Sequence, residues 1–155
     1  MEQAFLSLEA EQEGVLFPSP FTEGQVSIPI NGLIWMGDKD YMQQQIREKL
    51  SQGFHCIKMK IGAIDFDTEY ALLKGIRQQY APSDIELRVD ANGAFSPLEA
   101  LEKLKRLSDL QLHSIEQPIR AGQYEHMARL CEASPLPIAL DEELIGVACE
   151  KRKEQ

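Results

Sequence analysis

Two lysines interrupt what otherwise reads as a buried β-strand in the stretch HCIKMKIG. Lys58 and Lys60 alternate with Ile57, Met59 and Ile61, and side chains of a strand point alternately to its two faces. One face is therefore apolar and the other carries two cations. Each ammonium group disfavours the charge of the other, which lowers their pKa values. A lysine with a lowered pKa can act as a base, but an isolated K-x-K pair is more often two solvated residues of an edge strand.

Three carboxylates end the next three predicted strands, at nearly regular intervals along the chain. They are Asp90 in IELRVD, Glu116 in LHSIE and Asp141 in PIALD. Brought together without partners, they would repel one another, and a divalent cation would remove that repulsion. Oxygen ligands without Cys or His favour Mg²⁺ or Mn²⁺ over zinc. These three residues are thus the candidate metal ligands, and Lys60 is the candidate base, with its pKa lowered by Lys58 and the metal.

Each of these acids also has a purely structural interpretation when it is taken singly. Asp90 precedes Asn92 and Gly93, residue types that favour turns. Asp141 is placed to be the N-cap of a helix that follows it. The shared position of the acids at successive strand ends favours a common site.

Strands and helices alternate along the part of the chain that would position these residues. Strands are expected near 28–35, 56–61, 85–90, 112–116 and 137–141, and helices near 39–52, 66–80, 96–107, 124–132 and from about residue 142. This order predicts a parallel sheet with right-handed crossovers. The strands are apolar on one face only, which favours a barrel whose C-terminal rim carries the polar residues. A doubly wound sheet, apolar on both faces of its central strands, remains the structural alternative.

The motifs KMK, DAN, EQP and DE on the second to fifth expected strands resemble those of the enolase superfamily, in its muconate-lactonizing-type branch. The longer stretches INGLIW, FHCIKMKIG, LRVDANGAFSP, LHSIEQPI and PIALDEELIG resemble the o-succinylbenzoate synthases within that branch. The resemblance extends over essentially residues 29–146. The resemblance implies an α/β fold, a TIM-type (β/α) barrel.

The resemblance also implies roles for eight residues. They are the Mg²⁺ ligands Asp90, Glu116 and Asp141, the acid/base Lys60 with its auxiliary Lys58, and three residues near the substrate or behind the ligands, Asn92, Arg88 and Glu142. Mn²⁺ could replace Mg²⁺ at such a site.

The implied reaction begins with abstraction of a proton α to a carboxylate, a step assisted by the metal. In the synthases, 2-succinyl-6-hydroxy-2,4-cyclohexadiene-1-carboxylate is dehydrated to 2-succinylbenzoate in menaquinone biosynthesis. The same motifs leave open an N-succinylamino-acid racemase or a dipeptide epimerase. A non-catalytic half-barrel remnant is the alternative from another functional class.

Family members have an α+β capping domain before a barrel, and a complete barrel takes roughly 250 residues. The resemblance implies that residues 1–24 are the end of the capping domain with a linker, and that residues 25–155 hold about the first five βα units. A second lysine is expected on a sixth strand, past residue 155. We therefore expect this chain alone to be inactive and to self-associate through exposed barrel edges.

The bulk composition excludes several classes of partner. The 155 residues include 16 basic and 25 acidic residues, and a net charge of −9 repels a phosphate backbone, so we expect no nucleic-acid partner. No apolar run has the length of a membrane span. The three cysteines form no disulfide or zinc pattern. We expect a cytoplasmic protein that acts on a small carboxylate substrate.

Overall fold

The computed structural model describes residues 2–10 and 14–145. The chain divides into two units, Met1–Ile30 and Asn31–Gln155. The first unit contains helix α1 (Glu2–Glu9). Apolar side chains of this unit are exposed, among them Phe5 and Leu8 of α1 and Phe17 after it.

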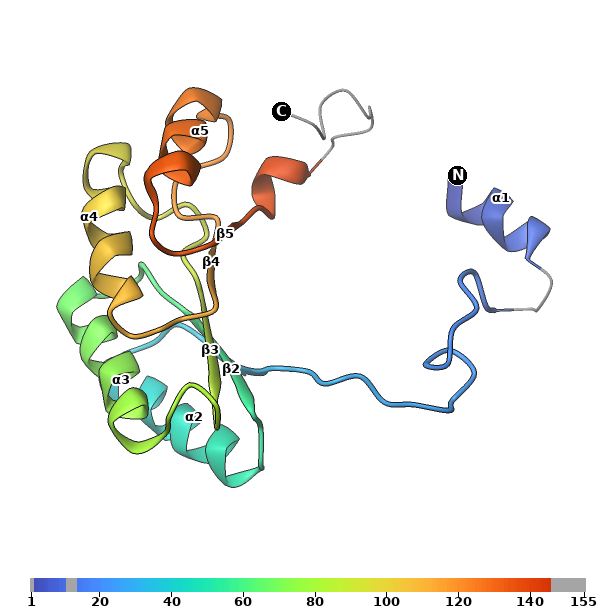
Figure 1. Cartoon of the computed structure of the whole chain (residues 1–155), viewed down its shortest axis with the longest axis horizontal. Coiled ribbons are helices and arrows are strands. Elements are labelled where there is room, and N and C mark those ends of the chain that lie inside the picture. The colour runs from blue at the N-terminus through green and yellow to red at the C-terminus, as the bar shows by residue number, and fades with distance from the viewer. Residues whose placement is uncertain (1, 11–13, 146–155) are drawn as a thin grey trace. The chain divides into compact units, whose positions relative to one another are not determined.

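The second unit is built on a five-stranded parallel sheet whose strands follow one another in chain order (Figure 1). The strands are β1 (Gly32–Ile34), β2 (Cys56–Lys60), β3 (Glu86–Asp90), β4 (Ser114–Glu116) and β5 (Ile138–Ala139). The helices are α2 (Lys39–Ser51), α3 (Phe66–Gln79), α4 (Pro97–Ser108) and α5 (Tyr124–Ala133), followed by a 3₁₀ turn, η1 (Glu142–Leu144).

Helices α2 to α5 all lie on one side of this sheet (Figure 1). Right-handed crossovers between strands in consecutive order place every helix on the same face. A doubly wound sheet would carry helices on both faces. The arrangement is that of a partial α/β barrel, as predicted.

Apolar residues of one parity form the core between the sheet and the helices. Strand residues Ile57, Met59, Leu87, Val89 and Ile115 are at most 1% exposed. Burial of an aliphatic side chain of this size contributes about 1.5–3 kcal/mol. The opposite parity, with Lys58 and Lys60 on β2, is left on the other face.

Parallel register aligns the polar ends of the strands in one row. Lys60 pairs with Asp90 across β2 and β3, and Asp90 pairs with Glu116 across β3 and β4. Glu116 in turn pairs with Ala139 of β5, just before Asp141.

Several elements are shorter than the sequence pattern predicted. The first strand was expected over 28–35 but covers only Gly32–Ile34, the residues that pair with β2. The final helix expected from about residue 142 begins as the 3₁₀ turn η1, and the rest of that prediction lies outside the described residues. Pairing with a neighbour, rather than local apolar character, decides where a strand begins and ends.

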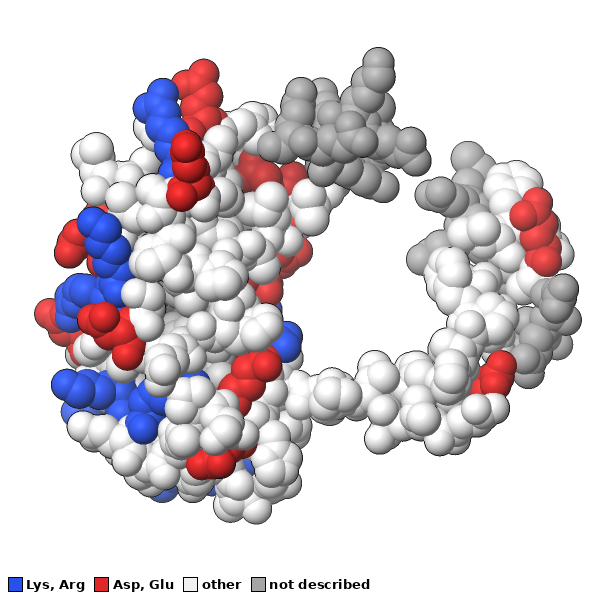
Figure 2. All heavy atoms as spheres, in the orientation of Figure 1, with Lys and Arg blue, Asp and Glu red and all other residues white. Residues whose placement is uncertain are grey.

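Charged side chains of both signs are interspersed over the layer of helices α2 to α5 (Figure 2). None of the described helices has the length and apolar character needed to cross a membrane.

Candidate active site

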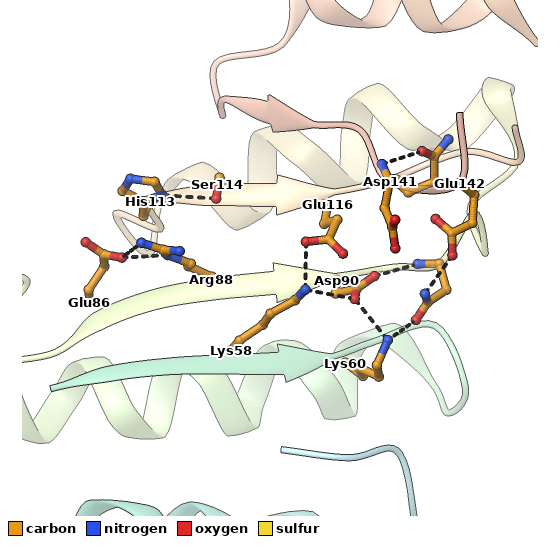
Figure 3. A network of polar contacts seen from close by, with 12 residues as sticks. Lys58, Lys60, Glu86, Arg88, Asp90, His113, Ser114, Glu116, Asp141 and Glu142 are labelled. Carbon is orange, nitrogen blue, oxygen red and sulfur yellow. Dashed lines mark hydrogen bonds and ion pairs between the residues drawn. The ribbon is translucent and has the colours of Figure 1, made fainter. Parts of the chain in front are cut away.

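The carboxyl ends of β2, β3 and β4 bring four charged side chains into one network (Figure 3). Lys60 Nζ lies 2.9 Å from Asp90 Oδ2, and Lys58 Nζ lies 3.2 Å from the same oxygen. Lys58 also donates to Glu116 Oε2 at 2.6 Å. The structure thus brings together both predicted catalytic lysines and two of the three predicted metal ligands.

The surroundings of Asp90 and Lys58 favour the charged form of each. Burial disfavours the charge on Asp90, which is 1% exposed, but hydrogen bonds from Lys60 and Lys58 outweigh that effect and lower its pKa. Burial alone would lower the pKa of Lys58, yet hydrogen bonds to Glu116 and Asp90 raise it. Lys58 is therefore held as a cation, which suits charge compensation rather than proton abstraction.

Asn92 lies directly beside Lys60. Its Oδ1 accepts from Lys60 Nζ at 2.7 Å, and its Nδ2 donates to Glu142 Oε1 at 2.8 Å. The backbone of Asn92 is left-handed, with φ of 44°, and its N–H donates to Asp90 Oδ1 at 3.1 Å. Glu142 Oε2 is buried and has no hydrogen-bond partner among the described residues. Asn92 and Glu142 therefore belong to the same rim as the lysines.

Asp141 follows β5 and is exposed. Figure 3 shows its carboxylate directed toward the side on which Glu116 and Asp90 lie. Its backbone N–H donates to the side-chain oxygen of Gln117 at 3.2 Å. The third predicted ligand thus reaches the rim through a loop.

Arg88 forms its contacts elsewhere on the same face. Its guanidinium lies 2.6 Å from Glu86 Oε1, toward the start of β3, where His113 Nδ1 and Ser114 Oγ are 3.0 Å apart (Figure 3). The structure does not bring Arg88 into contact with the rim carboxylates.

The carboxylates of the rim are compensated by lysines in this conformation. Over residues 2–10 and 14–145, no three His, Cys, Asp or Glu side chains are grouped so as to hold a metal ion. From the sequence, a metal cation was expected to remove the repulsion between these acids, whereas in the structure Lys58 bridges Asp90 and Glu116. The chemistry of the candidate ligands Asp90, Glu116 and Asp141 still fits Mg²⁺, because all three offer carboxylate oxygens, and the buried Glu142 Oε2, without a partner among the described residues, lies at the same rim.

The sequence pattern did not predict a role for Trp35 or for Gln117, which both lie near the site. The Trp35 ring, 55% exposed, lies with its centroid 5.5 Å from Lys60 Nζ. Gln45 of α2 accepts from Trp35 N at 3.0 Å and donates to Trp35 O at 3.1 Å. Trp35 could have been predicted to lie near the site, because it ends the first expected strand, as the other site residues end theirs. Gln117 follows Glu116 directly, and no local pattern marks its contacts.

Comparison with known proteins identifies the family to which this chain is related. Residues 41–151 match the family described as Enolase C-terminal domain-like. The chain is 58% identical over 152 residues to an o-succinylbenzoate synthase of Desulfotalea psychrophila, covering 98% of this chain and 41% of that protein. It is 37% identical over 101 residues to an N-succinylamino acid racemase of Thermus thermophilus, covering 65% of this chain and 26% of the racemase.

Solved structures agree with this assignment. The crystal structure of MenC from Desulfotalea psychrophila matches with a TM-score of 0.76 at 58% identity, covering 90% of this chain and 38% of MenC. An o-succinylbenzoate synthase from Thermosynechococcus elongatus, complexed with Mg in the active site, matches with a TM-score of 0.63 at 27% identity, covering 73% and 35%. This chain spans 41% or less of the length of these relatives. On the family match and the row of polar strand ends together, the chain belongs to the enolase superfamily.

Proposed function

We propose that this chain carries part of the active site of an Mg²⁺-dependent carbon–oxygen lyase, an o-succinylbenzoate synthase-like hydro-lyase. The reaction dehydrates 2-succinyl-6-hydroxy-2,4-cyclohexadiene-1-carboxylate to 2-succinylbenzoate. The observation that carries the proposal is the row of Lys60, Asp90 and Glu116 in register at the strand ends. The 58% identity to a synthase of that name supports the choice of substrate.

Lys60 is the acid/base in this proposal. Loss of one proton from the Lys60 ammonium group would leave two N–H bonds, which match the two acceptors present, Asp90 Oδ2 at 2.9 Å and Asn92 Oδ1 at 2.7 Å. One lone pair then remains to accept the proton α to the substrate carboxylate. The ring hydroxyl then leaves as water with the proton that Lys60 took up, and the product is aromatic. Lys58 keeps its charge and compensates the acids or the substrate carboxylate.

Asp90, Glu116 and Asp141 would hold the metal ion. A bound Mg²⁺ would neutralise the negative charge that develops on the substrate carboxylate when the proton leaves. Glu142 and Asn92 would lie near the substrate or behind these ligands, and Arg88 would act near the substrate only in a conformation that releases Glu86.

Titration of the purified chain with Mn²⁺, observed by electron paramagnetic resonance, tests the ligand set. We expect binding, and weaker binding in Asp90→Asn, Glu116→Gln and Asp141→Asn. Glu102→Gln, an exposed change on α4, is the matched control and should leave the affinity unchanged. Unchanged affinity in the three ligand variants would sink this assignment.

Calorimetry with Mg²⁺ present separates the related activities. We expect 2-succinylbenzoate to bind more tightly than an N-succinylamino acid or a dipeptide. Tighter binding of an N-succinylamino acid would instead favour the racemase alternative, which the 37% identity to a racemase supports. A chain that binds neither Mn²⁺ nor any of these compounds would be the non-catalytic remnant.

We further propose that residues 1–24 are the end of a capping domain and linker, and that residues 25–155 are the first part of the barrel. In this proposal Lys60 works with a second lysine on a further strand, so the chain alone should show no turnover. Measurable turnover by the pure chain would contradict it. We also propose a cytoplasmic location and self-association through strands β1 and β5, which lie at the two edges of the described sheet.

A further inference from the structure

The side chain of Gln117 is wholly buried and uses its full hydrogen-bonding capacity. Its Nε2 donates to Ile119 O at 3.0 Å and to Glu143 Oε2 at 3.1 Å. Its Oε1 accepts from the backbone N–H of Asp141 and of Glu143, both at 3.2 Å. A primary amide has two N–H donors and one oxygen with two lone pairs, so every site is occupied. The residue is 0% exposed, which makes the loss of any partner costly.

The backbone of Gln117 joins the same strand ends. Its N–H donates to Ala139 O at 2.9 Å, and its carbonyl accepts from Gly93 N at 2.7 Å. Its φ of 40° is left-handed, a conformation that a non-glycine residue adopts at a cost of about 1 kcal/mol. One residue thus ties the loop after β3, the end of β4 and the segment after β5 to one another.

The segment that carries Asp141 depends on these ties. Strand β5 has only two residues, and the 3₁₀ turn η1 begins immediately after Asp141. Gln117 holds the N–H groups of Asp141 and Glu143, and the Glu143 carboxylate in turn accepts from Gly122 N at 2.9 Å. The position of Asp141 relative to Glu116 therefore depends on the side chain of Gln117, the residue next to Glu116.

We propose that Gln117 is a positioning residue that sets the carboxylate of Asp141 against those of Glu116 and Asp90. The functional part of this inference rests on the proposed metal site. The amide is required because its oxygen faces N–H groups while its nitrogen faces a carbonyl and a carboxylate. A carboxylate at residue 117 would repel Glu143, and an apolar side chain would leave these groups without partners.

Gln117→Met tests the proposal, since Met has a similar volume and cannot make these hydrogen bonds. Gln45→Met is the matched control: Gln45 is also a buried amide, 9% exposed, and bonds a backbone N–H and carbonyl, those of Trp35. Both variants should lose comparable stability to urea. Only Gln117→Met should weaken Mn²⁺ binding, by about tenfold or more, the usual effect of removing a group that orients metal ligands.

Amide hydrogen exchange supplies a readout that does not depend on metal. We expect exchange at Asp141 and Glu143 to become about tenfold faster or more in Gln117→Met, while amides of β2 and β3 change no more than in Gln45→Met. Equal exchange at these two amides in both variants would overturn the inference. So would wild-type Mn²⁺ affinity in a Gln117→Met chain.

The outcomes also separate this inference from the proposed function. If the unaltered chain binds no Mn²⁺, the metal assignment fails, and hydrogen exchange alone decides whether Gln117 holds the segment. If the chain binds Mn²⁺ and only the ligand variants weaken it, the proposed function stands and the role of Gln117 is rejected.

Discussion

Asp90 carries a negative charge at a place where water cannot reach it. Its side chain is 2% exposed, and its charge is balanced by two ammonium groups, those of Lys58 and Lys60. An ion pair buried in this way gives little net stability compared with an apolar core, but removal of one partner leaves the others uncompensated. The row of polar residues is therefore also a stability determinant.

Asp90→Asn should lower the free energy of unfolding by about 3 kcal/mol, because two lysines then face each other without their shared counter-charge. Urea denaturation at neutral pH measures this. Glu99→Gln is the control, since Glu99 pairs with Lys103 on the surface of α4 and its loss should change stability much less. Equal effects of the two substitutions would contradict the importance of the buried network.

At the scale of elements, the loop after β3 is packed so closely at Gly93 that it leaves no space for an added side chain. Gly93, with φ of 73°, lies in the loop that follows Asp90, and a Cβ added there would lie 2.8 Å from Arg120 Cα. Gly53, with φ of 81°, has the same kind of backbone but nothing within 4 Å of an added Cβ. Substitution of Gly53 therefore tests the cost of the left-handed backbone alone, and substitution of Gly93 tests that cost together with a steric clash.

Gly53→Ala should cost about 1 kcal/mol of unfolding free energy, for the left-handed backbone alone. Gly93→Ala should cost roughly 3 kcal/mol, because the collision adds to that strain. Thermal or urea unfolding of both variants measures the difference. Similar losses would mean that the loop around Gly93 moves away from Arg120 at little cost.

Helix α3 holds the loop after Lys60 through a buried acid. Glu69, 1% exposed, accepts from the N–H groups of Gly62, Ala63 and Ile64 at 2.8–3.3 Å. Burial raises the pKa of Glu69, and these hydrogen bonds and the charge of Lys103 offset only part of that rise. The folded state therefore binds the Glu69 proton more tightly than the unfolded chain does.

Glu69→Gln should remove a pH dependence from the stability. A raised pKa in the folded state gives stability that is present below the unfolded value, about 4.3, and is lost as the pH rises through the folded value. The stability of the unaltered chain should hence decrease relative to that of Glu69→Gln as the pH rises from about 4 to 7. Urea unfolding at a series of pH values measures this, and a constant difference would contradict it.

For the molecule as a whole, the net charge of −9 opposes association, while the edge strands β1 and β5 favour it. Added salt shortens the range of the repulsion, from about 10 Å at 0.1 M to about 3 Å at 1 M. Sedimentation velocity should therefore show larger species at high salt than at low salt, at equal protein concentration. The mass of the monomer, about 17.5 kDa, at every salt and protein concentration would exclude self-association.

The alternation of strands and helices, and the row formed by Lys60, Asp90 and Glu116, follow from local pattern. Period-two alternation and the end of an apolar run are properties of neighbouring residues, and they suffice to place polar groups at strand ends. Because consecutive parallel strands present their carboxyl ends at the same edge, the meeting of these groups was predictable too. Exact strand bounds were not, since they depend on pairing with the next strand.

Other features were decided only by the tertiary structure. Gln117 stands beside Glu116 in the sequence, but the N–H groups that it accepts from belong to Asp141 and Glu143, far along the chain. Arg88 lies on the same face of the sheet as the site residues, but it forms an ion pair with Glu86 instead of contacting the rim. The sequence by itself determined that Lys60, Asp90 and Glu116 end their strands at the same rim. Which residues these side chains contact was decided only by the tertiary structure, because hydrogen bonds and ion pairs act at short range and the fold sets which segments come that close.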